Sequence, residues 1–205
     1  MESHKDLDVH SFRTQKSWVT WLKKNHRQYE SIWIKYAKKD SGFKSITYEE
    51  SREAAIMYGW IDGLINGYDD SWYLRKFSPR RPKSSWSKIN RGIAEKLIED
   101  GRMMEAGLAQ VKAAKADGRW SLAYDSPSKI QVPSELKKLL DGHSVAKHNF
   151  ENLNSSNRYA FLYRIQTAKR VETREKHIQK AFEMLKKGEV YHPTAAKKKA
   201  ARKKK

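Results

Sequence analysis

Apolar residues in the first 80 positions recur with two different periods. Trp18, Trp21 and Leu22 have the three- and four-residue spacing of an amphipathic helix, which predicts a helix at about 14–25. At about 31–37 a β-branched and aromatic run favours a strand. Alternation at about 60–66 and 71–77, on either side of "NGYDD", predicts two short strands joined as a hairpin.

Capping signals predict where several helices begin. "TYEE" from Thr47 to Glu50 has the spacing of a capping box, so it opens a helix that ends near Gly59. Ser87 is the candidate N-cap of a helix that ends at Gly101. Beyond a connector at about 120–133, successive stretches each show a cap residue followed by apolar positions at helical spacing.

These patterns predict a predominantly helical α+β fold. We expect a small N-terminal β element, a strand plus a hairpin, packed with helices and followed by an all-helical C-terminal half. A single domain is expected over 14–190, with a candidate sub-boundary near 120–133. A flexible N-terminus over 1–13 and a basic, disordered tail over 191–205 flank this domain.

Composition places the chain among soluble globular proteins. It has 205 residues, with 7 Trp, 10 Tyr and 6 Phe to supply apolar area. It has no Cys, which excludes a disulfide framework, a thiolate metal site and a thiol nucleophile. No secretory signal and no stretch near the roughly 20 apolar residues of a membrane span are visible, so we expect a cytoplasmic protein without membrane insertion.

A net charge of +19 raises the question of nucleic acid as a partner. The densest basic run is the tail "KKKAARKKK", which has no apolar anchor. Its cationic residues are candidates for weak, non-specific nucleic-acid contacts: Lys197, Lys198, Lys199, Arg202, Lys203, Lys204 and Lys205. No helix-turn-helix, zinc-finger or RNP signature supports sequence-specific reading.

Sequence motifs of known enzymes are missing. There is no phosphate-binding loop, no dinucleotide fingerprint, no nucleophile elbow and no zinc-protease helix, and the seven His show no spacing for a metal. We therefore expect no cofactor and no metal, lean towards a non-enzymatic protein, and leave catalytic residues unknown. Asp62, between Gly59 and Gly63, either caps a turn or serves as a base.

The stretch "PRRPKSSWSKIN" from Pro79 to Asn90 has the chemistry of an anion site. Its prolines restrict the loop and preorganise two arginines, whose guanidinium groups suit carboxylate or phosphate. Its serines precede a helix N-terminus, where backbone N–H groups donate hydrogen bonds to anions. The opposing interpretation is an N-cap with Trp86 packed beneath it and the cations in water. Together with two neighbours in "GWIDG", the candidate ligand-binding residues are Trp60, Asp62, Arg80, Arg81, Ser84, Trp86, Ser87 and Asn90.

We expect this loop to pack beside "GWIDG". A nearby carboxylate offsets clustered cations, which predicts Arg80 or Arg81 close to Asp62. Trp86 is expected to be at least half buried.

Four long segments carry a family resemblance: "SGFKSITYEESREAAIMYGWIDG", "FSPRRPKSSWSKIN", "LIEDGRMMEAGLAQVKAAKADGRW" and "RYAFLYRIQTAKRVETREKHIQKAFEMLKKGE". In order and spacing they resemble the YdeI/OmpD-associated (OmdA, bacteriocin-protection) family over about 15–190. The resemblance implies a link to tolerance of bacteriocins and cationic antimicrobial peptides and to expression of an outer-membrane porin. It implies no established enzymatic activity and no catalytic residues.

Three functions follow from these observations. The first is a non-enzymatic tolerance protein that binds an anionic ligand or protein partner at the basic loop. The second is a non-specific nucleic-acid-binding protein that uses the basic body and the lysine tail, with steep salt dependence. The third is an enzyme with Asp62 as base and an arginine as oxyanion clamp.

Overall fold

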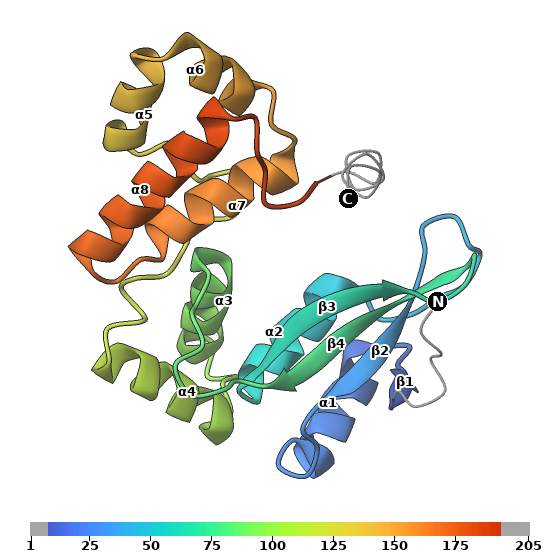
Figure 1. Cartoon of the computed structure of the whole chain (residues 1–205). Helices are drawn as coiled ribbons and strands as arrows, with labels where there is room; N and C mark the ends of the chain where they lie inside the picture. The colour runs from blue at the N-terminus through green and yellow to red at the C-terminus, as the bar shows by residue number, and fades with distance from the viewer. Residues whose placement is uncertain (1–7, 194–205) are drawn as a thin grey trace. The chain divides into compact units, whose positions relative to one another are not determined.

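The computed structural model describes residues 8–193 (Figure 1). The chain divides into two compact units, one up to Ala123 and one from Tyr124 onward. The boundary falls within the connector at about 120–133. The tail residues named above lie outside the described residues.

A four-stranded sheet in the order β1-β2-β4-β3 frames the first unit. β1 pairs parallel with β2, and β4 pairs antiparallel with both β2 and β3. The register of the β3–β4 hairpin shifts between Asp62 and Ile65. The strands are β1 (Val9–Ser11), β2 (Ile32–Ala37), β3 (Trp60–Gly67) and β4 (Trp72–Pro79).

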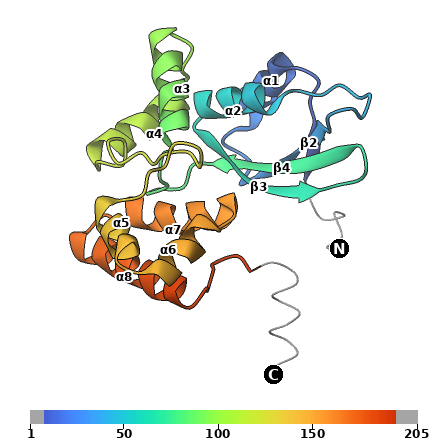
Figure 2. The same ribbon diagram turned by 90° about the horizontal axis from the view of Figure 1, so that it is seen from above.

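Two helices, α1 (Gln15–Asn25) and α2 (Tyr48–Met57), cover one face of this sheet (Figures 1 and 2). Both begin at a capping box: Thr14 with Ser17, and Thr47 with Glu50. In each box the Thr hydroxyl accepts a hydrogen bond from the backbone N–H of the residue three positions later, and the side chain of that later residue accepts from the backbone N–H of the Thr. These two bonds determine where the helix begins.

The core of the first unit lies between these helices and the sheet. Many of its large side chains come from α1 and from alternate strand positions that face the helices, among them Trp18, Leu22, Ile32, Ile34, Tyr36, Trp60 and Phe77. Trp18 and Trp60 meet edge to face, with ring centroids 6.1 Å apart. A period of two along each strand therefore places one set of residues in the core and the other set on the opposite face.

Helices α3 (Lys88–Glu99) and α4 (Glu105–Ala116) complete the first unit. α4 approaches the end of α2 through Gly107, which is buried. A Cβ at Gly107 would lie 2.4 Å from the backbone oxygen of Met57 and 2.7 Å from that of Ile56. Only a glycine allows this separation between a helix and a neighbouring backbone.

The second unit is helical over its described residues. An apolar cluster joins its helices, with Leu136, Phe150, Phe161, Ile165, Ile178 and Leu185 among its members. The helices are α5 (Ser134–Asp141), α6 (Ser144–Glu151), α7 (Ser155–Gln166) and α8 (Val171–Lys186).

An ion pair on the surface joins the first and last of these helices. Arg174 on α8 donates hydrogen bonds to the carboxylate of Glu135 on α5. This contact lowers the pKa of Glu135 to about 2.

The α+β fold class predicted from the sequence is confirmed: the described strands all lie within residues 9–79, together with two helices, and the elements after them are helices. β1 was not predicted. Three residues are too few to show a period, and the pairing of Val9 with Trp33 is set by a strand far along the chain. Among the described residues, no helix is long and apolar enough to cross a membrane.

Candidate anion-binding site

The segment between β4 and α3 is anchored at Arg80. Its backbone N–H donates to the oxygen of Gly59, over 2.9 Å, and its side chain is buried at 4% exposure. The guanidinium lies 3.6 Å from the ring centroid of Trp86 and donates to the Ser84 hydroxyl and the Ser85 carbonyl, over 3.3 and 3.2 Å. The loop therefore packs beside "GWIDG", as expected, and holds a buried cation in a fixed orientation.

Trp86 supports this loop from below. It is 1% exposed, so its predicted burial is confirmed. Its ring meets that of Trp120 edge to face, with centroids 4.9 Å apart. The loop thus has an aromatic base contributed by the segment after α4.

A second buried arginine, Arg119, donates a hydrogen bond to the same loop. It is 5% exposed, donates to the carbonyl oxygen of Ser84 over 2.8 Å, and pairs with Asp117 at 2.7 Å. Sequence reasoning missed Arg119, because nothing in "ADGRW" distinguishes it from a solvated cation after a helix. Its role depends on a contact with a residue 35 positions earlier.

Ser87 begins α3 as predicted. Its hydroxyl accepts from the backbone N–H of Asn90 over 3.1 Å, which occupies one of the free N–H groups of the first turn. Asn90 itself is buried at 7% exposure. These two residues support the position of the loop from its C-terminal end.

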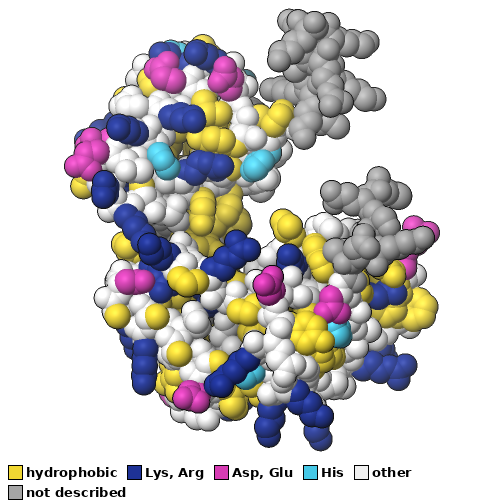
Figure 3. Space-filling view, turned by 60° about the horizontal axis from the view of Figure 1, so that its bottom comes forward, with side chains coloured by type: hydrophobic (Ala, Val, Ile, Leu, Met, Phe, Trp, Pro, Cys, Tyr) yellow, Lys and Arg dark blue, Asp and Glu magenta, His cyan; other side chains and the backbone are white. Residues whose placement is uncertain are grey.

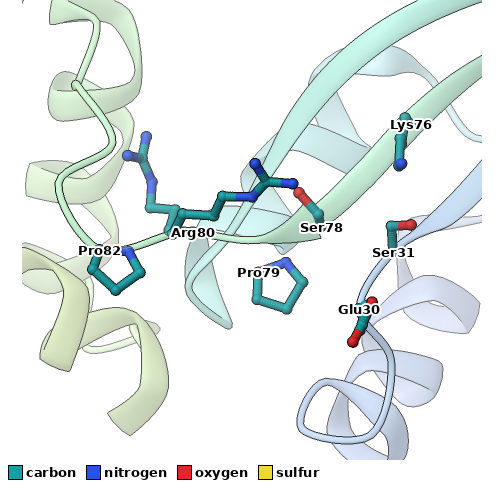
Figure 4. A pocket seen from close by; sticks show the side chains of 8 residues that line it. Glu30, Ser31, Lys76, Ser78, Pro79, Arg80 and Pro82 are labelled. Atoms are coloured by element: carbon teal, nitrogen blue, oxygen red, sulfur yellow. The ribbon is translucent and has the colours of Figure 1, made fainter.

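A hollow of about 400 Å³ opens beside the loop. Glu30 and Ser31, which precede β2, lie across it from the proline-bracketed segment, and Lys76 and Ser78 come from β4 (Figure 4). The lining residues are Glu30, Ser31, Lys76, Ser78, Pro79, Arg80, Arg81 and Pro82. Arg81 is exposed, unlike its neighbour Arg80.

The expected partner of Asp62 was wrong. Arg75 donates to its Oδ2 over 2.8 Å, and the hydroxyl of Tyr48 donates to the same oxygen over 2.9 Å. Asp62 pairs across the hairpin with Phe77, so its side chain and that of Arg75 share the helix-covered face. Arg80 does not belong to the alternate positions 75 and 77 of β4 that share this face, and its guanidinium lies over Trp86 instead.

The environment of Asp62 favours a structural role. The guanidinium of Arg75 also lies 3.9 Å from the ring centroid of Tyr48, so the three side chains form one compact group. Burial raises the pKa of Tyr48, and the neighbouring Asp62 carboxylate raises it further. The use of Asp62 as a catalytic base stays a prediction. Among residues 8–193, no cluster of three or more His, Cys, Asp or Glu side chains is placed to hold a metal ion.

The structure therefore brings together part of the predicted site. Arg80, Ser84, Trp86, Ser87 and Asn90 form one connected loop and helix start. Arg81 adds an exposed cation at the hollow, whereas Trp60 belongs to the core and Asp62 to the pair with Arg75. Glu30, Ser31, Lys76 and Ser78 were missed: the sheet brings Glu30 and Ser31 next to the loop, whereas Lys76 and Ser78 come just before it in the chain but carry no signal of their own.

Two family models match separate parts of the chain. The model described as "Domain of unknown function (DUF8412)" matches residues 10–110, which contain the hollow and its loop. The search of curated proteins and the search of solved structures found no match. The model described as "Bacteriocin-protection, YdeI or OmpD-Associated" (OmdA) matches residues 129–188. The family resemblance found over about 15–190 is thus confirmed in the second unit, where residues 129–188 match the YdeI/OmpD-associated model.

Proposed function

We propose that this protein is a non-enzymatic binding protein whose ligand is an anion with a phosphate-like group, held in the hollow of the first unit. The observation that carries this proposal is that Lys76, Arg80 and Arg81 all line one open space of about 400 Å³. The hydroxyl groups of Ser31 and Ser78 line the same space and supply neutral donors. Among the described residues that line it, Glu30 is the only carboxylate.

Preorganisation of the loop supports this function. The guanidinium of Arg80 is buried against Trp86 and donates to the Ser84 and Ser85 oxygens, so it holds the loop in place and little backbone entropy of the loop remains to be lost on binding. Arg81 is exposed and presents a planar fork that suits phosphate. A fixed cation beside an accessible one is the arrangement that an anion site needs.

The local arrangement matters more here than the net charge. On the face drawn in Figure 3, lysine and arginine side chains are spread among carboxylates and do not gather into one large patch. Such mixed surfaces are typical of solvated proteins. The hollow differs because three cations from β4 and the following loop line one space.

The link to bacteriocins enters through the second unit. The description of the OmdA model concerns residues 129–188 and not the hollow. Direct capture of a cationic peptide by a chain of net charge +19 is opposed by like-charge repulsion. We therefore propose that any tolerance of bacteriocins or cationic antimicrobial peptides arises indirectly.

Calorimetric titration with pyrophosphate tests the anion site. The full chain should bind pyrophosphate, and Arg81→Ala should weaken this binding by about tenfold or more, since a charge-assisted hydrogen bond contributes about 1.5–3 kcal/mol. Arg13→Ala is the matched control, because Arg13 is exposed and does not line the hollow.

Two results contradict the proposal. One is the absence of pyrophosphate binding at millimolar concentration by the wild-type chain. The other is an equal loss of affinity in Arg13→Ala and Arg81→Ala, which would assign the binding to net charge alone.

A further inference from the structure

The second unit has a hollow of its own, which the proposed function does not use. It has a volume of about 320 Å³ and is lined by α5 and α6, two short helices that Gly142 and His143 join. The segment before α5 and the beginning of α7 complete its wall, and we call it the α5–α6 hollow. Its volume lies within the range of roughly 300–1,000 Å³ that small-molecule sites have.

The apolar side chains of this hollow are the most deeply buried part of its wall. Leu140 on α5 and Phe150 on α6 are each 4% exposed, and Val132 packs against the same apolar cluster. The charged side chains of the wall are exposed or half-buried, so they form its rim. A hydrocarbon group that entered the hollow would therefore exchange water for apolar contacts, which favours binding.

The charges at the rim do not cancel. The carboxylate of Asp141 accepts hydrogen bonds from the ammonium groups of Lys137 and Lys147, over 2.6 and 2.9 Å. These contacts lower the pKa of Asp141. Two ammonium groups thus share one carboxylate. Arg158 and Glu151 also line the hollow, so three cations face two carboxylates and one positive charge is left over.

Arg158 is the cation that remains available to a ligand. Its guanidinium lies 4.4 Å from the ring centroid of Phe150, and among the described residues no carboxylate forms an ion pair with it. It is the fourth residue of α7, whose first turn has no acidic residue. Because the N-terminus of a helix carries a positive partial charge, a cation at this position is unfavourable for the helix itself. An anion at the guanidinium would compensate for both charges.

We infer that the α5–α6 hollow binds a small carboxylic acid that carries an apolar group. The apolar group lies against Leu140 and Phe150, and the carboxylate accepts hydrogen bonds from Arg158, whose planar fork suits it. One excess positive charge at the rim matches a ligand with one negative charge. The inference is independent of the proposed anion site, because that site lies in the first unit.

Nuclear magnetic resonance of the uniformly nitrogen-15-labelled full chain tests this inference, with octanoate as the probe. Octanoate should shift the amide signals of Phe150 and Arg158 with a Kd of about 1 mM, as expected for a ligand of about ten non-hydrogen atoms. Acetate, which lacks the alkyl chain, and octylamine, which has the opposite charge, should shift these signals far less. N-acetyl-L-leucine presents the same chemistry as the end of a peptide, so the tighter of the two acids distinguishes a peptide terminus from a free alkyl acid.

Substitutions at the rim locate the carboxylate. Arg158→Gln should weaken octanoate binding about tenfold, because a charge-assisted hydrogen bond is lost. Arg170→Gln is the matched control, since Arg170 is exposed at the start of α8 and does not line the hollow. Glu151→Gln should instead tighten octanoate binding about twofold, because it removes a negative charge that repels the ligand.

Four results would each overturn the inference: octanoate shifts spread evenly over both units, acetate shifts as large as those of octanoate, equal losses in Arg158→Gln and Arg170→Gln, or unchanged affinity in Glu151→Gln. Arg158 also packs on Phe150, so the ligand-free spectrum of Arg158→Gln shows whether that variant folds. If it does not fold, Glu151→Gln decides, because a gain in affinity cannot result from unfolding.

Discussion

Adding a single methyl group at Gly107 should destabilise the first unit. In Gly107→Ala the new Cβ would meet the backbone oxygens of Met57 and Ile56 at 2.4 and 2.7 Å and the sulfur of Met103 at 2.5 Å. Ordinary contact begins near 3.4 Å, so α4 and the end of α2 must separate by about 1 Å. That movement also loosens Val111, which α4 buries in the same core.

The size of the effect follows from two opposing terms. Overpacking costs about 1–3 kcal/mol, and the upper part of this range applies because two of the obstructing atoms are backbone. Replacing glycine by alanine inside a helix stabilises the helix by about 1 kcal/mol, because alanine has the higher helix propensity. We therefore expect the free energy of unfolding to fall by about 2 kcal/mol.

Urea denaturation followed by tryptophan fluorescence measures this change. All seven tryptophans lie before Tyr124, so the signal reports the first unit alone. With a slope of about 2 kcal/mol per molar, the midpoint should fall by about 1 M urea.

Gly92→Ala in α3 is the matched control. Gly92 is exposed and has no atom within 4 Å of the added Cβ, so this variant should gain up to about 1 kcal/mol. If Gly107→Ala is as stable as Gly92→Ala, the close approach of α4 to α2 is refuted.

Two further predictions concern the side chains between the sheet and α2. Burial raises the pKa of Tyr36 above its ordinary value near 10, so the stability of the first unit is complete below about pH 10 and declines as the pH rises further. Tyr36→Phe, which also loses a 2.6 Å hydrogen bond to Ser51, should be less stable at pH 7 but show a shallower alkaline decline of the urea midpoint; an unchanged decline would contradict this cause. Arg75→Met should cost about 2 kcal/mol in the same fluorescence assay, because Asp62 keeps only Tyr48 as a donor at 17% exposure. The more exposed pair of Arg102 with Glu53 provides the comparison, since Arg102→Met should cost less than about 1 kcal/mol; equal costs would show that burial does not strengthen the Asp62 pair.

Local signals in the sequence were sufficient where the physics is local. The capping box at Thr47 and the N-cap at Ser87 lie where the structure places them, because a side chain and a backbone N–H three residues apart decide a helix start. The hairpin strands were likewise readable from alternation, since its two runs are neighbours along the chain.

Contacts between distant segments were not readable in this way. Which arginine pairs with Asp62 depends on the register of β3 against β4, and this register shifts after Asp62. An error of one residue in the register would place a side chain on the opposite face of the sheet. Arg119 and Ser31 reach the loop and the hollow only through the tertiary fold. Sequence reasoning therefore found the basic loop but missed the residues that fasten it and those that complete the hollow.

The two separate cores have a consequence for how this chain can evolve. Substitutions in the cluster around Trp18 and Trp60 and those in the cluster around Phe161 and Ile178 fall in different apolar clusters, so their effects on stability should add. Different family models match the two units, over residues 10–110 and 129–188. A role inferred from either family model therefore applies only to the unit that the model matches, and the history of one half says nothing about that of the other.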